Sequence, residues 1–479
     1  MKKLDVFILT LIIIVAFIFR LYKISTPLAD LHSWRQADTS AVTRNFVKRE
    51  VDFFHPRYDD LSNNQTGREN PEGYRFVEFP IYNALVATIY KLFPLFSIEV
   101  YGRLVTAVFS LFIILVLYYL GLKESGRTTA IIASFVYAVF PFFVFFSRVI
   151  LPETTSLSFV FLSIYFLYLF SGSKRKVSSV VWFIFSLVFF MFSLLVKPPA
   201  IFYSITLLFL FYKKFGLTLI KKPAVYLYFI LGIIPLALWR LYIQSYPEGI
   251  PPSDWLITMV NTYQGLQNIF FRPAFFRWIF FERINNFILG GYLTFFLILG
   301  ILVNQKKYIL SSILISALAY LFTFQGGNVQ HEYYQTYILP AIALFIGVGV
   351  STVIENKKLF FQPFISYSVI LALFGLSFFF SFYKVKDYYS YPPELPQIAN
   401  IVKTLTNEGD KIVTDRIGDT TLLYLTERKG APSIYKDPPE LKKLGYKYLV
   451  TLHADLIKDL KEKKYKVVFE NDSFAMFKL

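Results

Sequence analysis

The chain has 479 residues, of which 55% are hydrophobic and only 17% are charged, and its mean hydropathy is +0.50. This is more apolar surface than a water-soluble chain of this size buries, so we expect an integral membrane protein. The absence of cysteine excludes disulfides, thiolate zinc sites and cysteine nucleophiles. The formal charge of +17 is dispersed between apolar runs, which argues against nucleic acid as a partner.

Apolar runs long enough to cross about 30 Å of hydrocarbon predict about eleven membrane helices. They lie at 6–22, 99–121, 128–147, 153–171, 178–196, 199–213, 224–243, 284–303, 308–325, 336–354 and 363–383. With the N-terminus inside, the short turns rich in lysine and arginine all fall on the cytoplasmic side, which is the positive-inside pattern. These basic turns also favour a prokaryotic plasma membrane.

The same parity places three longer segments outside the membrane, at 23–98, 244–283 and 384–479. The first of these segments contains an apolar stretch at 79–96, which two prolines interrupt. We therefore predict a helix that lies in the outer interface rather than one that crosses the bilayer.

Beyond residue 385, short β-type runs alternate with polar helical stretches. The expected strands are 411–414, 446–452, 466–469 and 474–477, and the expected helices are 396–405 and 454–463. The sequence thus predicts a membrane domain over 1–385 and a small extracytoplasmic α/β domain over 386–479. Because the small domain has no Gly-rich phosphate loop, we interpret it as a lid or an acceptor platform.

The densest polar cluster follows the first predicted membrane helix. It contains Asp30, His32, Arg35 and Asp38, and His55 lies further along the same loop. Carboxylates, an imidazole and a guanidinium at a membrane surface can supply a general base and a phosphate clamp. The alternative is a solvated loop with ordinary salt bridges.

Two residues of this cluster share one face if 34–47 is helical. Arg35 and Asp38 are three residues apart, so Arg35 can hold Asp38 toward a cavity. Asp30 lies before that helix, and two interpretations stay open for it, a helix cap or a second acidic ligand.

Two further acids lie at predicted membrane borders. Glu78 is flanked by apolar residues, where a carboxylate is costly unless it is paired, so it is a site acid, a cap of the interfacial helix or a partner of Arg75. Glu153 begins a predicted helix after a short outer turn. It either complements the helix dipole or contributes to the site.

Basic and aromatic residues of the later outer segments are candidates for binding a lipid phosphate. Arg272 and Arg277 are interleaved with aromatic residues, as expected for an interfacial helix that touches anionic headgroups. His331 and Tyr334 open a late predicted span, where they can donate to a phosphate oxygen. Interfacial anchoring is the alternative for the tyrosine.

Taken in chain order, these features resemble the GT-C membrane glycosyltransferases. More narrowly, they resemble the bacterial branch related to protein O-mannosyltransferases and the aminoarabinose lipid A transferase. The likeness rests on Asp30 with the following His-x-Trp-Arg-Gln-x-Asp-Thr, on Glu-Phe-Pro-x-Tyr, on Arg103, on an outer Leu-Pro-Glu turn and on a late His-x-Tyr-Tyr. It covers roughly residues 1–385.

The resemblance implies a GT-C fold and transfer of a single sugar from a polyprenyl-phosphate donor to a lipid, glycan or protein acceptor. The reaction is expected at the outer face of the membrane and with inversion. An acidic residue of the first loop would deprotonate the acceptor hydroxyl, while cations and polar donors stabilise the departing lipid phosphate.

By this resemblance the catalytic acid is sought among Asp38, Asp30 and Glu78. The expected donor-phosphate residues are Arg35, His331, Tyr334, Arg272 and Arg277, and the expected acceptor or metal-side residues are Glu153, His32 and His55. The chain departs from the family pattern twice. Many relatives carry an Asp-Glu pair where this chain has Arg35-Gln36, and many carry Lys or His where it has Glu78.

Two rival classes of protein stay open. A lipid-linked oligosaccharide transporter or flippase carries charges along a path within its spans, whereas the clusters here gather at predicted outer ends. A non-catalytic membrane scaffold tolerates loss of the acids. Membrane lipids, a polyprenyl-phosphate sugar and an acceptor are the expected partners. The sequence assigns no cofactor and leaves a divalent cation, Mg²⁺ or Mn²⁺, open.

Overall fold

The computed structural model describes residues 2–253, 256–257, 260–262, 265–267, 273–303, 307–355 and 362–479. The chain divides into two compact units. The helical unit comprises Met1–Ile24, Leu104–Leu238 and Ser253–Asp387, and the mixed unit comprises Ser25–Arg103, Trp239–Pro252 and Tyr388–Leu479. The mixed unit therefore joins most of the first predicted outer loop to the segment that the sequence predicts as a separate C-terminal domain.

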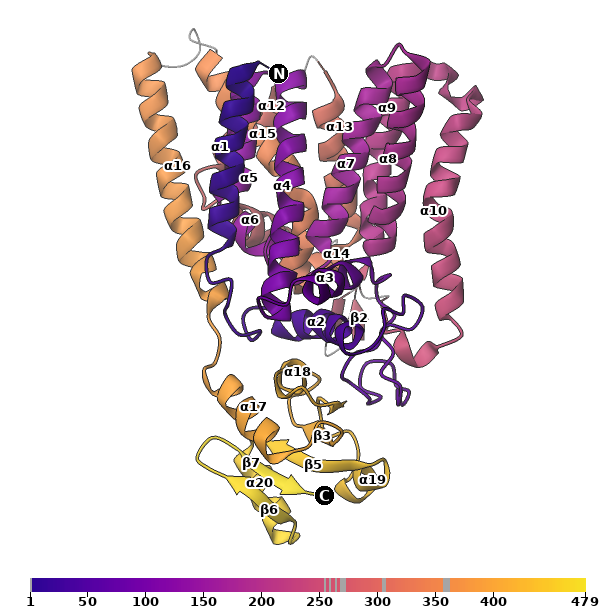
Figure 1. The fold of residues 1–479 in the computed structure, drawn as a ribbon. Coiled ribbons are helices and arrows are strands. Elements are labelled where there is room, and N and C mark those ends of the chain that lie inside the picture. The colour runs from indigo at the N-terminus through magenta and orange to yellow at the C-terminus, as the bar shows by residue number, and fades with distance from the viewer. Residues whose placement is uncertain are drawn as a thin grey trace. The chain divides into compact units, whose positions relative to one another are not determined.

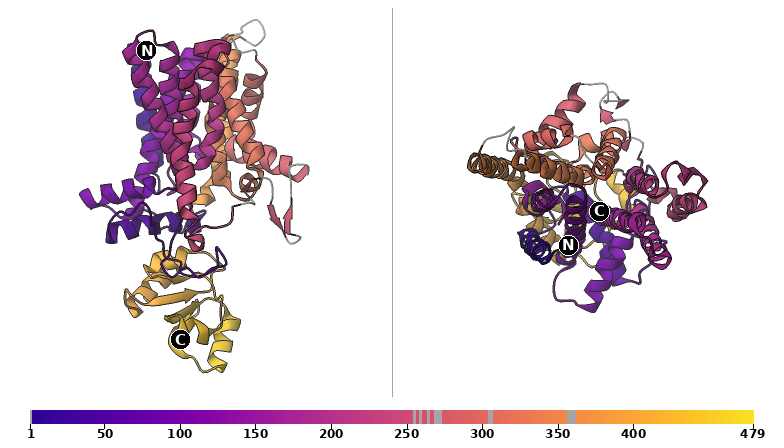
Figure 2. Two further views of the ribbon diagram at one scale, coloured as in Figure 1. Left: turned by 90° about the vertical axis from the view of Figure 1, so that its right-hand side faces the viewer. Right: turned by 90° about the horizontal axis from the view of Figure 1, so that it is seen from above.

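Long apolar helices make up most of the helical unit, and Figures 1 and 2 show them running side by side. The elements that lie wholly or mainly in this unit are α1 (Lys3–Arg20), α4 (Ile98–Glu124), α5 (Arg127–Val139), α6 (Pro141–Phe146), α7 (Glu153–Gly172), α8 (Lys176–Val196), η1 (Pro198–Tyr203), α9 (Ser204–Phe215), η2 (Gly216–Lys221), α10 (Pro223–Ile243), β1 (Val260–Thr262), β2 (Gly265–Gln267), α11 (Pro273–Phe276), η5 (Arg277–Ile288), α12 (Thr294–Leu302), α13 (Ile309–Thr323), α14 (Gln325–Gln330), η6 (Glu332–Ile338), α15 (Leu339–Glu355) and α16 (Pro363–Val385). Large side chains such as Phe7, Ile230 and Leu371 are exposed on these helices, as expected where lipid is the solvent.

Glycines bring α15 against its two neighbours. A Cβ added at Gly300 of α12 would lie 1.9 Å from the carbonyl oxygen of Phe345, and one added at Gly349 would lie 2.0 Å from that of Phe296. On the α5 side, a Cβ at Gly347 would lie 2.6 Å from the carbonyl oxygen of Thr129. Small residues at these positions let the helix backbones approach closely, which is a common way to pack helices in lipid.

Seven of the described helices are long and apolar enough to cross a membrane. They are Ile98–Glu124, Glu153–Gly172, Lys176–Val196, Pro198–Lys221, Pro223–Ile243, Glu332–Glu355 and Phe364–Leu405. The predicted run 128–147 is not one helix, because Phe140 is extended ahead of Pro141 and separates α5 from α6. In the predicted run 284–303, Gly290 and Gly291 have positive φ and lie between η5 and α12. The count of eleven crossings stays a prediction.

A five-stranded mixed sheet forms the C-terminal part of the mixed unit, with strand order β4-β3-β5-β7-β6. The elements of this part are η7 (Lys386–Tyr389), α17 (Glu394–Leu405), β3 (Lys411–Thr414), α18 (Thr421–Thr426), β4 (Gly430–Ala431), α19 (Pro438–Lys443), β5 (Tyr446–Thr451), α20 (Ala454–Glu462), β6 (Lys466–Glu470) and β7 (Ala475–Lys478). Strand β3 is parallel to β4 and β5, and β7 is antiparallel to β5 and β6. The four strands predicted from the sequence are β3, β5, β6 and β7.

Alternate residues of these strands build two small cores, one on each face of the sheet. Ile412, Val450 and Met476 pack in one cluster with residues of α17 and α18. Their chain neighbours, including Val413 and Phe477, pack in the other cluster with residues of α19 and α20. Helices on both faces therefore bury the two sides of the sheet.

The first loop supplies two helices to the mixed unit, α2 (Ser33–Lys48) and α3 (Ile81–Leu92), which contact each other. The Asn83 amide of α3 donates to the carbonyl of Thr39 at 2.6 Å and to the hydroxyl of Thr43 at 3.1 Å. Leu92 and the following Phe93 are exposed. The helix predicted at 79–96 is thus present, and its place in the membrane interface stays a prediction.

The first loop also extends the sheet at its β4 edge. The Gly430 amide donates to the carbonyl of Asp59 at 2.9 Å, and the Leu61 amide donates to the carbonyl of Gly430 at 2.7 Å. A Cβ at Gly430 would lie 1.7 Å from the carbonyl oxygen of Ile412, so only glycine fits here. The loop covers an edge that would otherwise present unpaired backbone groups.

Candidate active site

Asp30 lies just before α2 and is held by two side chains. His32 has a left-handed backbone (φ 56°) and is the residue that caps α2, so the cap interpretation of Asp30 is wrong. The Gln36 amide donates to Asp30 Oδ1 at 2.7 Å, and Arg103 Nη2 lies 3.6 Å from Asp30 Oδ2. Because the Asp30 and Arg103 side chains are both fully buried, their charges compensate each other in a dry environment.

Asp38 is the most enclosed acid of α2, and both of its oxygens have partners. Arg75 donates to Oδ2 at 2.7 Å, and the Thr420 hydroxyl, which precedes α18, donates to Oδ1 at 2.7 Å. The interpretation that Arg35 holds Asp38 is therefore wrong. The spacing along α2 gave the right face of the helix, but Asp38 takes its cation from a residue of the loop.

Glu78 pairs with Arg35, and this is the third acid–arginine pair around α2. The alternative that Glu78 pairs with Arg75 is wrong, because Arg75 contacts Asp38. The Glu78 side chain is 14% exposed, whereas those of Asp30 and Asp38 are fully buried. Glu78 is thus the acid of the three that solvent reaches.

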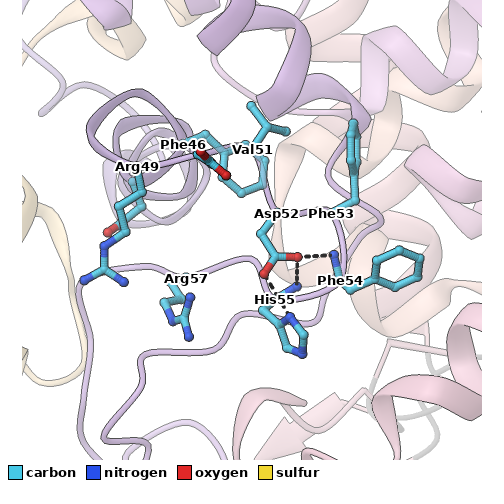
Figure 3. Close-up of a pocket in the computed structure, with 10 residues that line it drawn as sticks. Phe46, Arg49, Val51, Asp52, Phe53, Phe54, His55 and Arg57 are labelled. Carbon is cyan, nitrogen blue, oxygen red and sulfur yellow. Dashed lines mark hydrogen bonds and ion pairs between the residues drawn. The ribbon is translucent and has the colours of Figure 1, made fainter.

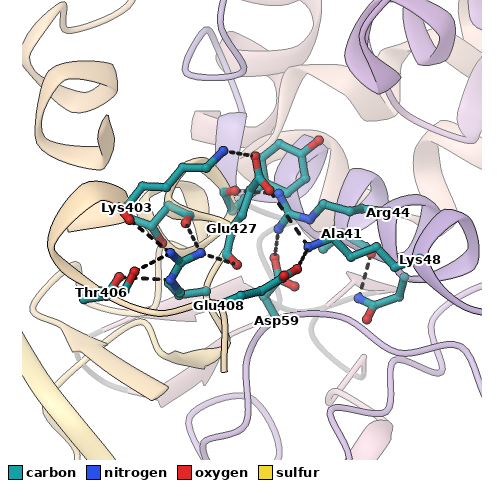
Figure 4. A network of polar contacts seen from close by, with 12 residues as sticks. Ala41, Arg44, Lys48, Asp59, Lys403, Thr406, Glu408 and Glu427 are labelled. Atoms are coloured by element: carbon teal, nitrogen blue, oxygen red, sulfur yellow. Dashed lines mark hydrogen bonds and ion pairs between the residues drawn. The ribbon is translucent and has the colours of Figure 1, made fainter. Parts of the chain in front are cut away.

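Arg44, two turns further along α2, is paired with Asp59 and donates to the carbonyl of Tyr424 at 2.7 Å. Figure 4 shows this arginine beside a second network, in which Lys48 pairs with Glu408 on the outside of the unit. The Arg44 guanidinium also lies 4.1 Å from the centre of the Tyr424 ring. These contacts fasten α2 to α18.

Asp60 is buried beside the Asp38 pair. Burial raises the pKa of the Asp60 carboxyl to about 7, the hydrogen bonds from Ser62 oppose this rise, and the negative charge of Asp38 adds to it. The Ser62 amide and hydroxyl donate to Asp60 Oδ1 at 2.8 and 2.6 Å. The neighbouring Arg75 lies over the ring of Tyr58, 5.1 Å from its centre. A carboxyl that titrates near neutral pH therefore lies close to a candidate catalytic acid.

His55 takes part in an aromatic and polar cluster after α2. Its Nδ1 lies 2.9 Å from Asp52 Oδ2, and its Nε2 lies 2.9 Å from the Tyr242 hydroxyl and 3.2 Å from the Tyr246 hydroxyl. The contact with Asp52 fixes the orientation of the His55 imidazole. A role on the acceptor side stays a prediction.

In the helical unit, Glu153 begins α7 and forms a buried ion pair with Lys197, with 2.8 Å between Lys197 Nζ and Glu153 Oε1. Their side chains are nearly inaccessible to solvent. Lys197 therefore neutralises a buried carboxylate. A role for Glu153 toward the acceptor or a metal stays a prediction.

The candidate phosphate residues of the later segments also lie in the helical unit or outside the described residues. His331 stacks on Tyr333 with ring centres 5.3 Å apart, and Tyr334 is buried next to it. Arg277 is exposed and lies 3.9 Å from Glu282. Arg272 lies outside the described residues. In the described part of the chain, no three His, Asp or Glu side chains are arranged to hold a metal ion.

Comparison with known proteins identifies the fold. The structure is similar to ArnT from Cupriavidus metallidurans bound to undecaprenyl phosphate, with a TM-score of 0.67 and 13% identity over 99% of this chain and 97% of that chain. The chain has the GT-C fold of the membrane glycosyltransferases. It is accordingly an integral membrane protein with several helical spans.

Further GT-C structures and one family model agree with this assignment. The archaeal oligosaccharyltransferase AglB from Archaeoglobus fulgidus, in complex with an inhibitory peptide and a dolichol-phosphate, matches with a TM-score of 0.60 and 11% identity over 99% of this chain and 74% of that chain. Arabinofuranosyltransferase AftD from Mycobacteria matches with a TM-score of 0.56 and 14% identity over 98% of this chain and 41% of that chain. Residues 78–241 match the family model of dolichyl-phosphate-mannose-protein mannosyltransferase. The sequence matches no curated protein.

The sequence predicts the candidate acids of the site but not the residues that bond to α2 from elsewhere in the chain. Thr420 and Tyr424 carry no motif, and only their place beside α2 gives them a role. Asp59 and Asp60 were visible as a pair of acids in the first loop. Two adjacent carboxylates followed by Ser62 are a signal that could have prompted a search for a buried carboxyl.

Proposed function

We propose that this protein transfers a single sugar from a polyprenyl-phosphate donor to a lipid, glycan or protein acceptor at the outer face of a prokaryotic plasma membrane. The proposal includes eleven crossings, a cytoplasmic N-terminus and an extracytoplasmic mixed unit. The fold supports it, since ArnT shares nearly the full length of the chain and binds undecaprenyl phosphate, and AglB binds a dolichol-phosphate. The family model over 78–241 points to the same kind of donor.

The observation that carries the proposal is the cluster of buried acid–arginine pairs around α2. Buried ion pairs are poor devices for stability, because desolvation of the charges offsets their attraction. In the described part of the chain four of them lie around one helix: Arg44–Asp59, and the three that contain the candidate acids, Asp30–Arg103, Asp38–Arg75 and Arg35–Glu78. Such a cluster in the first loop of a GT-C fold is an arrangement suited to catalysis.

We assign the general base to Glu78 and a supporting role to Asp38 and Asp30. A base must reach the acceptor hydroxyl, and Glu78 is the acid of the three with an accessible side chain. Arg35 holds the Glu78 carboxylate in place through Oε1.

In the proposed step the acceptor hydroxyl gives its proton to Glu78 while its oxygen attacks the anomeric carbon. The bond from that carbon to the phosphate oxygen breaks, and its electron pair leaves with the polyprenyl phosphate. A single displacement inverts the configuration at the anomeric carbon. Cationic and hydroxyl groups, with Arg35, His331, Tyr334 and Arg277 as our candidates, stabilise the phosphate charge.

The experiment is single-sugar transfer by the purified protein in nanodiscs, with radiolabelled polyprenyl-phosphate sugars as donors. We expect Glu78→Gln to lower kcat by about 10²- to 10⁴-fold, which is the range for removal of a general base. Glu408→Gln is the matched control, because Glu408 is an exposed acid of the same unit.

The outcomes separate the assignment from the function. Full activity of Glu78→Gln together with loss of activity in Asp30→Asn or Asp38→Asn would move the base to the inactive variant's residue. Full activity in all three variants, or absence of transfer by the unaltered protein with every donor, would overturn the proposed function. In the latter case, movement of labelled lipid-linked oligosaccharide across the bilayer would support a flippase.

A further inference from the structure

The mixed unit contains a cavity of about 540 Å³ where α2 ends and the first loop turns back. Figure 3 shows Arg49 and Arg57 on one side of it and Phe53, Phe54 and His55 on the other. The volume lies within the range of about 300–1,000 Å³ that is usual for pockets that bind small molecules. None of the acid–arginine pairs of the candidate active site lines it.

Two arginines, Arg49 and Arg57, line this cavity, and Lys429 is close enough to both to interact with them electrostatically. In the part of the chain that the structure describes, neither Arg49 nor Lys429 forms an ion pair, and Arg57 is 3.1 Å from Glu72. Burial lowers the pKa of the Lys429 ammonium, and the positive charges of Arg49 and Arg57 lower it further, against the opposing effect of Asp59. The three cations therefore interact with one another, as they do where an anion is to be bound.

Two acids, Glu50 and Asp52, also line the cavity. The Asp52 carboxylate is bound by His55 Nδ1 at 2.9 Å and by the backbone amides of Phe54 and His55 at 3.0 and 3.1 Å. Glu50 is exposed to solvent. The Asp52 carboxylate is thus already bound by donors, whereas Glu50 leaves one solvent-exposed carboxylate at the cavity.

Two aromatic rings also line the cavity and are held in place by their neighbours. Phe53 is 36% exposed and stacks on Phe79, with ring centres 5.6 Å apart and planes 11° apart. Phe54 is 54% exposed and meets Tyr242 edge-on at 5.4 Å. Fixed apolar ring faces favour the C–H face of a sugar, because little ordering of side chains is needed on binding.

We propose that this cavity binds an anionic saccharide, a sugar that carries a phosphate or a carboxylate group, as the acceptor of the transfer reaction. Arg49, Arg57 and Lys429 bind the anionic group, and Phe53 and Phe54 pack against the ring. The acceptor role rests on the proposed function, whereas binding of the saccharide does not require it.

The test measures binding to the full-length protein in phosphatidylcholine nanodiscs, so that no anionic headgroup competes. The probes are glucose 1-phosphate, glucuronate, glucose and inorganic phosphate. We expect the two charged sugars to bind at least tenfold more tightly than glucose or inorganic phosphate, with an affinity that falls as salt is added. Arg49→Ala and Lys429→Ala should each weaken binding of the charged sugars about tenfold or more.

Lys458→Ala is the matched control, since Lys458 is an exposed lysine of α20 that makes none of these contacts, and it should bind as the unaltered protein does. Arg49→Gln and Phe54→Leu keep most of the side-chain volume, so they are less prone to unfold the protein than alanine variants are. Each should also weaken binding. Equal binding of glucose and the charged sugars, equal binding of inorganic phosphate and glucose 1-phosphate, or unchanged affinity in Arg49→Ala and Lys429→Ala would overturn the proposal. Since no donor is present, these results stand apart from the transfer assay.

Discussion

The two units of the molecule satisfy their buried polar groups in different ways. In the helical unit, many hydroxyls and arginines bond to backbone carbonyls, as when Arg20 donates to the carbonyls of Ala16, Ala138 and Tyr137, and Glu153 with Lys197 is a buried ion pair of this unit. In the mixed unit, arginines of α2 and its surroundings pair with carboxylates. A backbone carbonyl binds a side chain without adding a net charge. A carboxylate adds a full negative charge, which can accept a proton or stabilise a positive charge. We therefore expect the catalytic acid in the mixed unit, as proposed above.

The largest effect is expected from removing a cation of the mixed unit. Arg44→Ala leaves Asp59 buried without its partner, which we expect to cost about 3–5 kcal/mol of unfolding free energy. Thermal unfolding and limited proteolysis of the mixed unit would measure the loss. Lys48→Ala, four residues along the same helix, should change little because its pair with Glu408 is exposed. Equal sensitivity to the two changes would contradict the comparison.

The second effect is a pH dependence from Asp60. Its folded pKa of about 7 lies above the ordinary aspartate value of 3.8, so the folded state binds more protons than the unfolded chain between these values. Stability is therefore highest at low pH and falls as pH rises through the folded pKa. We expect a loss of roughly 2 kcal/mol between pH 5 and pH 8.

Asp60→Asn should flatten this part of the pH profile, because the amide oxygen can still accept the Ser62 hydrogen bonds. Unfolding followed at several pH values on both proteins gives the two slopes. Parallel profiles would show that Asp60 does not titrate in this range.

The smallest effect is expected in the helical unit. The Ser186 hydroxyl is 2.8 Å from the carbonyl of Ser163 and 2.7 Å from the Tyr228 hydroxyl. Ser186→Ala should destabilise the protein by only about 0.6 kcal/mol, the average for hydrogen bonds between helices in a membrane. Denaturation in mixed detergent micelles would resolve the difference from Arg44→Ala. A loss of several kcal/mol would show that a hydrogen bond of the helical unit contributes as much to stability as an ion pair of the mixed unit.

The fold was largely predictable because hydropathy and β-type alternation are local signals. The helix expected at 34–47 is α2, and the strand expected at 411–414 is β3. The boundaries of the runs 128–147 and 284–303 were less predictable, since Pro141 and the pair Gly290 and Gly291 divide apolar stretches that hydropathy treats as continuous.

The candidate site was predictable in its residue types but not in its pairings. Spacing along α2 correctly placed Arg35 and Asp38 near each other, yet each takes its partner from elsewhere. Arg75 lies 37 residues from Asp38, and Thr420 lies 382 residues from it. No local pattern records such a distance, because it is set by the tertiary fold.

This separation also sets an order of events during synthesis. At roughly 5–20 residues per second, about 20–80 s pass between the synthesis of Asp38 and that of Thr420. The β4 edge that pairs with Asp59 and Leu61 is equally late. A chain that stops before residue 420 has all of the candidate acids but not the hydroxyl that closes over Asp38. The contacts of the candidate site therefore form only after Thr420 and the β4 edge have been synthesised.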